Sequence, residues 1–184
     1  MTSPAWTDDE IVARIRDFAK VRRLPRPAPA QAADEFEALT GFPMQPLLRR
    51  IYCEAADGGF GPYGGALRRR GSVPCGVVSL TDTKQRFSNE VSLTTLYRTW
   101  LSQPPGEDGF HPRNVLPLAT LGGVIWWCID LSTPEGRMWG GDENACDRHW
   151  LAPQDLTLAE WLTDWLRGDH TPPVIPAVPG CPIC

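Results

Sequence analysis

Four residues in the C-terminal third of the chain have the types and the spacing of a zinc site. Cys146 and His149 form a C-x-x-H pair, and Cys181 and Cys184 form a C-x-x-C pair. Thiolates and imidazoles are the ligands of structural zinc, so the two pairs could together supply a tetrahedral set. The alternatives are free thiols or a disulfide formed on handling, because the second pair lies at the tip of a Pro-rich segment. We expect no metal and no other cofactor.

A second candidate is the glycine-rich stretch at residues 59–64, which satisfies the dinucleotide-binding pattern G-x-G-x-x-G, with Asp82 near the distance expected for a ribose-binding acid. That motif should follow a strand and open a helix, whereas this stretch follows a predicted helix. Pro62 also removes a backbone donor that a pyrophosphate would need. We therefore interpret the stretch as a turn-forming loop.

Catalytic signatures are missing from the sequence. It holds no G-x-S-x-G, no H-E-x-x-H and no Walker lysine, and its only lysines are Lys20 and Lys84. Asp130 ends a predicted buried strand, where a catalytic carboxylate could lie, but no nucleophile with a nearby base accompanies it. The three arginines at 68–70 form one short run without interleaved aromatic residues, which favours an exposed loop. We expect a protein that is not an enzyme.

Charge is distributed unevenly along the chain. The formal net charge is −4, but residues 11–70 hold eleven Lys or Arg against six acids, while residues 130–170 hold three Arg against nine acids. An acidic balance argues against a dedicated nucleic-acid binder. Asp142, Glu143 and Asp147 lie between two tryptophans, Trp139 and Trp150, which suggests an interface for a basic protein. A solvated loop with no role is the alternative.

Aromatic residues could complete such an interface. Trp126 and Trp127 are consecutive in a strand-like run, so their side chains must point to opposite faces of a sheet. We expect one to enter the core and the other, on the face away from the helices, to be able to anchor a partner.

Apolar periodicity, capping signals and turn residues define the elements that would position these groups. The predicted helices cover residues 8–23, 30–41, 45–56, 86–102 and 156–167, and the predicted strands cover 73–80, 115–121, 124–129 and 137–139. This order is not the regular alternation of a doubly wound sheet, so it predicts an α+β fold. The residues expected to build the core are Phe36, Leu47, Ile51, Leu96, Trp100, Val124, Ile129 and Trp161.

Length and composition set the frame for this fold. A chain of 184 residues with 42% hydrophobic and 22% charged residues fits one globular domain. No apolar run approaches the roughly 20 residues that span a bilayer, and the acidic start of the sequence is unlike a signal peptide. We expect a cytoplasmic protein with mostly reduced cysteines and no membrane partner. The predicted divisions are a helical extension with a Pro-rich linker at 1–28, a domain at 29–170 and a Pro-rich tail at 171–184.

Short motifs in this order resemble those of the SUKH superfamily, the Smi/Knr-type domain. The first half contributes a corner at residues 41–43 (Gly-Phe-Pro) and a helix ending at residues 57–59 (Asp-Gly-Gly), where the family has Asn-Gly-Gly. The second half contributes a Leu-Pro-Leu strand at 116–118, a Gly-Gly turn at 122–123 and a strand ending in Asp130. A short strand at 137–139 and a helix with aromatic anchors follow. The resemblance covers roughly residues 30–168.

This resemblance implies a mixed, mostly antiparallel sheet packed against helices, to which the chain adds an N-terminal helix. It implies a structural role for Asp130, holding the turn after its strand. It also implies a non-enzymatic protein-binding function, as in immunity proteins that neutralise a cognate bacterial toxin, often a nuclease, by stoichiometric binding. The alternative is a cytoplasmic scaffold or regulatory module of the same family without a toxin partner. The sequence leaves the oligomeric state open.

Overall fold

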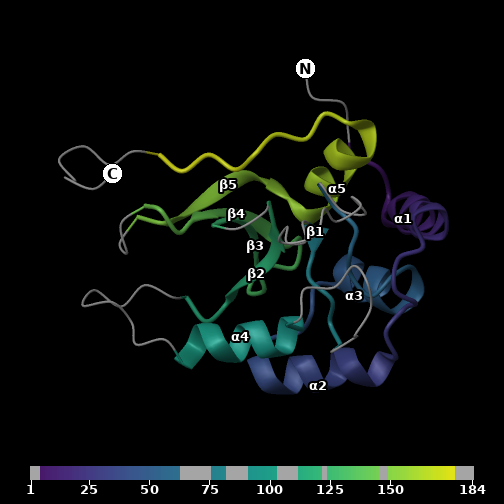
Figure 1. Cartoon of the computed structure of the whole chain (residues 1–184), viewed down its shortest axis with the longest axis horizontal. Coiled ribbons are helices and arrows are strands. Elements are labelled where there is room, and N and C mark those ends of the chain that lie inside the picture. The colour runs from purple at the N-terminus through teal and green to yellow at the C-terminus, as the bar shows by residue number, and fades with distance from the viewer. Residues whose placement is uncertain are drawn as a thin grey trace, which may run out of the picture.

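The computed structural model describes residues 5–62, 76–81, 91–102, 112–121, 124–145 and 149–176. These residues form helices and one sheet, which confirms the α+β prediction (Figure 1). The elements are α1 (Asp8–Arg22), α2 (Ala30–Thr40), α3 (Pro46–Glu54), β1 (Gly76–Val77), α4 (Leu93–Ser102), β2 (Val115–Thr120), β3 (Ile125–Asp130), β4 (Arg137–Asp142), β5 (Leu151–Thr157) and α5 (Leu158–Arg167). In this part of the chain, no helix is both long and apolar enough to cross a membrane.

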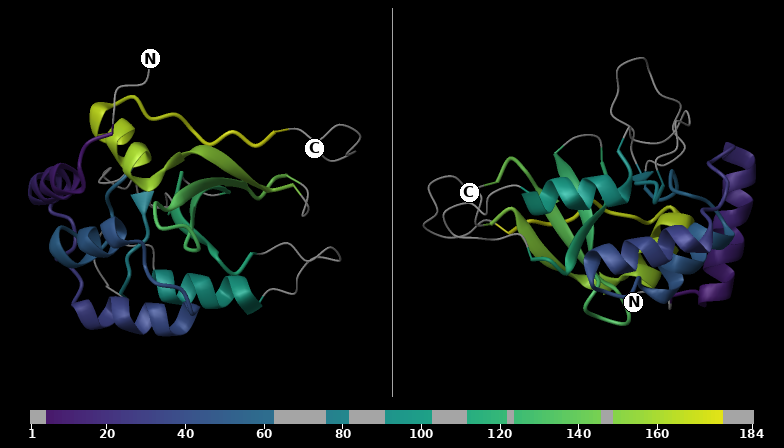
Figure 2. Two further views of the ribbon diagram at one scale, coloured as in Figure 1. Left: turned by 180° about the vertical axis from the view of Figure 1, so that it is seen from behind. Right: turned by 90° about the horizontal axis from the view of Figure 1, so that it is seen from below.

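The sheet has the strand order β1-β2-β3-β4-β5, and each strand pairs antiparallel with the next. The described strands are therefore antiparallel throughout, where a mixed and mostly antiparallel sheet was expected. The register between β2 and β3 shifts between Pro117 and Ala119. Proline cannot donate to a ladder, so an irregularity beside it is the expected place for the shift. Figure 2 shows the sheet from behind and from below, with helices on both sides.

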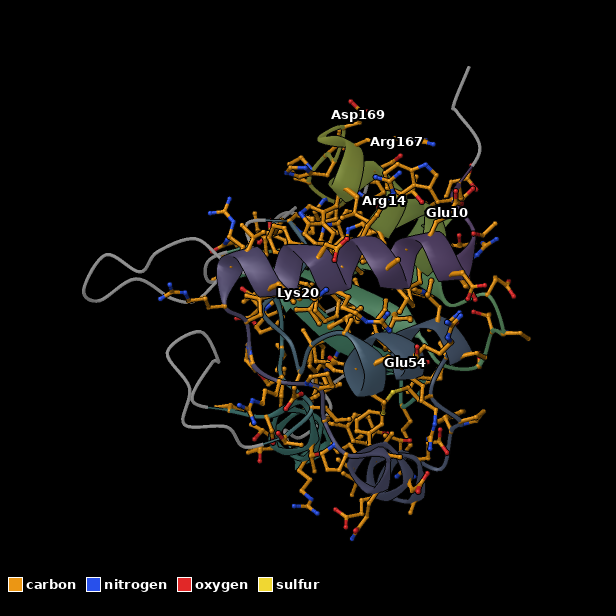
Figure 3. The ribbon with its side chains drawn as sticks, turned by 90° about the vertical axis from the view of Figure 1, so that its right-hand side faces the viewer. Glu10, Arg14, Lys20, Glu54, Arg167 and Asp169 are labelled. Carbon is orange, nitrogen blue, oxygen red and sulfur yellow. The ribbon has the colours of Figure 1, made fainter. Side chains whose placement is uncertain are left out.

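Helix α1, expected as part of an extension, contributes to the main core. Its N-terminus has the predicted capping box between Thr7 and Glu10, and Arg23 ends it in the left-handed conformation with φ 55°. Ile11 and Ile15 are completely buried in the main hydrophobic cluster. Figure 3 shows α1 lying between α5 and α3, and it contacts both helices.

Trp6, which precedes α1, packs the start of the chain against α1 and α5. The Trp6 backbone N–H donates to Thr163 Oγ1 of α5 over 3.1 Å. The guanidinium groups of Arg14 and Arg167 lie 3.9 and 5.0 Å from the centroid of the Trp6 ring. Cation–π contacts of this kind add stability to apolar packing, so residues far apart in sequence hold α1 against α5.

The Asp-Gly-Gly turn after α3 fixes the segment that contains β1. The buried Asp57 carboxylate accepts from the backbone N–H of Leu80 at 2.6 Å and from both the N–H and the hydroxyl of Thr81. Gly58 has φ +84°, and a Cβ there would lie 2.7 Å from the backbone of Ser79, so only glycine fits. The turn is thus a structural clasp.

The glycine-rich stretch continues this clasp over its described residues, 59–62. The Gly59 N–H donates to Val77 O at 2.8 Å, and the Val77 N–H donates back to Phe60 O at 2.7 Å. Phe60 is completely buried against the ring of Tyr52. The Gly59 N–H is therefore committed to β1, and residues 59–62 form neither a helix nor a strand, which agrees with the interpretation as a turn-forming loop.

Most of the predicted core is buried, with one error. Phe36, Leu47, Ile51, Ile129 and Trp161 are all buried as expected. Leu96 and Trp100 are half-buried on α4. Val124 is 39% exposed, so its assignment to the core was wrong. It precedes the first residue of β3, and its carbonyl accepts the Glu143 N–H at 2.9 Å instead of joining the packed face.

Element boundaries also differ from the prediction at three places. The last predicted strand, 137–139, is too short, because β4 continues to Asp142, and β5, which was not predicted, follows it. Helix α4 begins at Leu93 instead of residue 86, after Ser92, whose hydroxyl accepts the Thr95 N–H at 3.2 Å. The first predicted strand, 73–80, is reduced in its described part to the two residues of β1. A hydroxyl cap at Ser92 stops the helix from extending toward its N-terminus.

Candidate functional site

The two consecutive tryptophans of β3 lie on opposite faces of the sheet, as predicted. Trp127 is 2% exposed, and its ring centroid lies 5.8 Å from that of Trp161 on α5. Trp126 is half-buried and pairs across the sheet with Gly141 of β4. Because cross-strand partners share a face, Trp126 and Gly141 lie on the face away from α5. Trp126 is therefore the tryptophan that can reach a partner.

A second hydrophobic cluster covers this face, and Trp126 packs against both this cluster and the main core. Its buried members are Val115, Cys128, Trp150 and Leu151, and its half-buried members are Trp100, Trp126, Trp139 and Ala145. The rings of Trp100 on α4 and Trp150 before β5 lie 5.1 Å apart, so α4 reaches across the face to the edge strand. Helix α4 therefore covers part of this face, and the indole groups of Trp100, Trp126, Trp139 and Trp150 line it.

Carboxylates border this aromatic cluster at the end of β4. Glu143 Oε1 accepts the indole N–H of Trp126 at 2.8 Å. Asp142 Oδ1 accepts both the backbone N–H and the side-chain amide of Asn144, each at 2.9 Å. Val124 lies at the same place, because its carbonyl accepts the Glu143 N–H. We call Val124, Trp126, Asp142 and Glu143 the acidic indole surface.

Among the described residues, the donors given to the carboxylates of this surface carry no charge. The donors to Asp142 and Glu143 are amides and an indole, which are neutral. By contrast, the ion pairs found among the described residues join positions between 9 and 54, for example Arg49 with Asp34 and Glu37. Four basic residues of the N-terminal half, Arg16, Lys20, Arg49 and Arg50, thus pair with acids, whereas the contacts described for Asp142 and Glu143 involve neutral groups.

The negative charge of Glu143 also acts on the buried thiol of Cys128. Burial raises the pKa of Cys128, and the Glu143 carboxylate adds to the effect. Burial likewise raises the pKa of Cys53 on α3. A thiol becomes nucleophilic only as the thiolate, so both groups are held in their unreactive form.

Asp130 has a structural environment. Its Oδ1 accepts the Ser132 N–H at 2.8 Å, the Ser132 hydroxyl at 2.6 Å and the side-chain amide of Asn114 at 2.8 Å. The carboxylate therefore holds the turn after β3 and ties it to the start of β2, the role that the sequence resemblance implied.

Most of the predicted zinc ligands lie outside the described residues. His149 lies before β5, whereas Cys146, Cys181 and Cys184 fall outside the described residues, as does Asp147 of the predicted acidic interface. Among the residues that are described, no three His, Cys, Asp or Glu side chains form a group that could hold a metal ion. The zinc hypothesis stays untested for the residues that carry it.

Sequence reasoning identified Asp142, Glu143 and the Trp126/Trp127 alternation, but it missed the contact between Trp100 and Trp150. That contact depends on β5, and Pro153 in the middle of β5 hides the strand from a pattern search. The run Trp150-Leu151-Ala152 was the available signal.

Comparison of the chain with protein-family models, with curated proteins and with solved structures finds no match.

Proposed function

We propose that this protein is a non-enzymatic binding domain that engages a basic protein through the acidic indole surface, and that its role is to neutralise a toxin domain as an immunity protein. The observation that carries this proposal is the pairing of the Trp126 indole with Glu143. It places a large half-buried aromatic group beside two carboxylates whose donors among the described residues are neutral. Aromatic anchors with a charged border are the usual composition of a protein interface.

A nuclease-like domain is the partner that best suits this charge. Such a domain must present a positive surface to attract phosphates, so a negative surface can approach it quickly and cover its substrate site. The resemblance to the SUKH superfamily adds support for an immunity role. The alternative is a scaffold or regulatory module of the same family that binds a basic protein without neutralising a toxin.

Association kinetics with a catalytically inactive, basic toxin domain test this proposal. The double variant Asp142→Lys, Glu143→Lys should lower the association rate constant about tenfold or more at low salt and weaken its salt dependence. The matched control is Glu135→Lys, Asp155→Lys. It makes the same change of charge at exposed positions, in the turn before β4 and near the end of β5. The control should leave the rate within about twofold.

The outcomes separate the proposals. Equal slowing by both double variants would mean that only net charge matters, and it would contradict the assigned surface. If the wild-type protein binds the toxin domain and an equimolar amount abolishes its nuclease activity, the immunity role is supported. Binding without loss of nuclease activity would favour the scaffold alternative.

A further inference from the structure

The Pro-rich segment that follows α5 lies against the sheet rather than projecting from it. Gly168 ends α5 with φ 86°, and residues 171–176 then run back along β5 (Figures 1 and 2). The segment has no regular secondary structure, as the sequence predicted. Its placement was not predicted, and it follows from two positions of the sheet, Gly140 and Gln154.

Gln154 holds both backbone groups of one residue in this segment. Its Oε1 accepts the Val174 N–H at 3.0 Å, and its Nε2 donates to the Val174 carbonyl at 2.9 Å. Nε2 is also within bonding distance of Ala152 O at 3.1 Å, which orients the amide. The Gln154 amide therefore pairs with the Val174 backbone as a neighbouring strand would, and it makes no contact that depends on the Val174 side chain.

Gly140 provides the space beside this pair. A Cβ at Gly140 would lie 2.4 Å from Pro173 Cβ and 3.1 Å from Ile175 Cδ1. Pro173 and Ile175 are half-buried, whereas Val174 between them is 69% exposed. The alternation of half-buried and exposed side chains shows that the segment is extended. Its two inward residues, Pro173 and Ile175, lie against Gly140, where the lack of a Cβ leaves room for them.

We call Gly140 and Gln154 the seat of the segment. This seat lies on the face of the sheet opposite to the acidic indole surface. Gly140 pairs with Trp127 of β3 and with Ala152 of β5. These residues share the face that α5 covers, since Trp127 packs on Trp161. The segment thus continues the cover that α5 begins.

Proline suits this seat for a physical reason. The hydrogen bonds that Gln154 makes to the segment use only the backbone of Val174, so proline at 173 or 176 forfeits no donor. Proline also restricts the free chain to extended conformations, which reduces the entropy lost on binding. A backbone clamp on one residue with prolines around it is the chemistry of recognising an extended, proline-containing peptide.

We propose that Gly140 and Gln154 form a binding site for an extended peptide of the pattern Pro-x-aliphatic, which this chain fills with its own residues 173–175. The short connection from α5 gives the segment an effective concentration on the order of millimolar, so a free peptide must compete with it. The site is therefore occupied from within until the segment is displaced. This proposal does not rest on the proposed function, because the two surfaces lie on opposite faces.

The test uses a full-length variant in which the segment no longer occupies the site, while Gly140 and Gln154 are unchanged. The variant Pro173→Asp, Ile175→Asp replaces the two inward side chains of the segment and alters no residue of the sheet. A blocked peptide with the sequence of residues 171–176 is titrated into isotope-labelled protein, and the Gly140 backbone and Gln154 side-chain signals are followed by NMR. The emptied variant should bind saturably, about tenfold or more tighter than the wild type, in which the tethered segment competes.

Two further variants make the result decisive. Adding Gln154→Ala to the emptied variant should weaken peptide binding about tenfold or more, because the backbone clamp is lost. Adding Asp155→Ala, at the exposed neighbouring position, should leave the affinity within about twofold. No signal change at Gly140 and Gln154 up to millimolar peptide would overturn the proposal, as would equal binding by the wild-type and emptied proteins.

The docked segment can be checked in the otherwise unchanged chain. Gly140→Ala should speed hydrogen exchange of the Val174 amide at least about tenfold, because the new Cβ displaces Pro173. Gly141→Ala is the matched control, since its Cβ would meet Trp150 and Leu151 on the other face. If Val174 exchanges at the same rate in all three proteins, the segment is not seated on Gly140 and the proposal fails.

Discussion

Trp126 and Trp127 are consecutive residues of one strand, and their surroundings differ as much as the two faces of the sheet. Trp127 is packed on Trp161 beneath α5, in a face that is closed by helices and by the C-terminal segment. Trp126 is half-buried among other indoles and donates its N–H to Glu143. Both faces are apolar, so hydrophobic content alone does not distinguish a core from a binding surface.

What distinguishes the faces is the way polar groups are satisfied at their borders. On the helix side, Asp57 is buried and receives its hydrogen bonds from the chain that it clasps. On the other side, Glu143 uses one oxygen for Trp126 and lies in an exposed loop. A carboxylate of the first kind stabilises the fold, and a carboxylate of the second kind keeps charge available for a partner.

Truncating the two tryptophans tests this contrast most directly. Trp127→Ala leaves a cavity under α5 and should lower the free energy of unfolding by about 3–5 kcal/mol. Trp126→Ala removes a half-buried ring at the same kind of backbone position and should cost about 1 kcal/mol. Urea denaturation of both variants measures the difference. Equal losses would mean that the second cluster is as much a core as the first.

Removing the buried carboxylate of Asp57 should have the next largest effect on the free energy of unfolding. Asp57→Ala leaves the N–H of Leu80 and the N–H and hydroxyl of Thr81 without their acceptor, at a cost of about 2–3 kcal/mol. Asp57→Asn keeps one acceptor oxygen and should cost less. Denaturation at neutral pH measures both, and a loss for Asp57→Ala below about 0.5 kcal/mol would contradict the clasp.

The pH dependence of the Asp57→Asn comparison has a defined sign. Desolvation by burial raises the pKa of Asp57, opposed by the hydrogen bonds from Thr81 and Leu80. A folded-state pKa above the unfolded one means that the native protein binds more protons between the two values, so this group's contribution to stability falls as pH rises through that window. The stability of the wild type relative to Asp57→Asn should therefore decrease from the ordinary aspartate pKa up to the raised pKa of Asp57, and stay constant above it. An increase over that window would contradict the raised pKa.

The same two regions show how far the sequence could lead. The capping box at Thr7, the end of the first helix near Arg23 and the alternation of Trp126 and Trp127 follow from local rules, and all three are confirmed. Local rules suffice there because the hydrogen bonds and the side-chain directions depend on neighbouring residues.

The missed features depend on residues that are distant in sequence. Strand β5 contains Pro153, and it is held by pairing with β4 rather than by its own pattern. Val124 was assigned to the core as an apolar position of the strand predicted at 124–129, but strand β3 begins one residue later and Val124 is 39% exposed. The seating of Val174 depends on the Gln154 amide 20 positions away. No propensity scale contains such contacts, because tertiary context decides them.

Removing the carboxylate beside Trp126 should have a smaller effect than removing Asp57. Glu143→Ala loses one exposed hydrogen bond and should lower the free energy of unfolding by about 0.5–1 kcal/mol. Glu143→Gln retains an acceptor for the indole N–H, so its stability should match the wild type while its charge is lost. Comparing the two variants in denaturation and in partner association separates the structural use of Glu143 from the electrostatic one. A large stability loss for Glu143→Gln would show that the charge itself supports the fold.

The smallest effect is expected at Val124, and it sharpens the boundary between the faces. Val124→Ser changes an apolar side chain that is 39% exposed and lies outside β3, so the free energy of unfolding should change by less than about 0.5 kcal/mol. Ile129→Ala, in the same strand region but completely buried, should cost about 2–5 kcal/mol and serves as the comparison. Because the carbonyl of Val124 and not its side chain joins it to Glu143, the serine variant keeps that contact. A stability loss near that of Ile129→Ala would mean that Val124 is packed, and the edge of the acidic indole surface would then have to begin at Trp126.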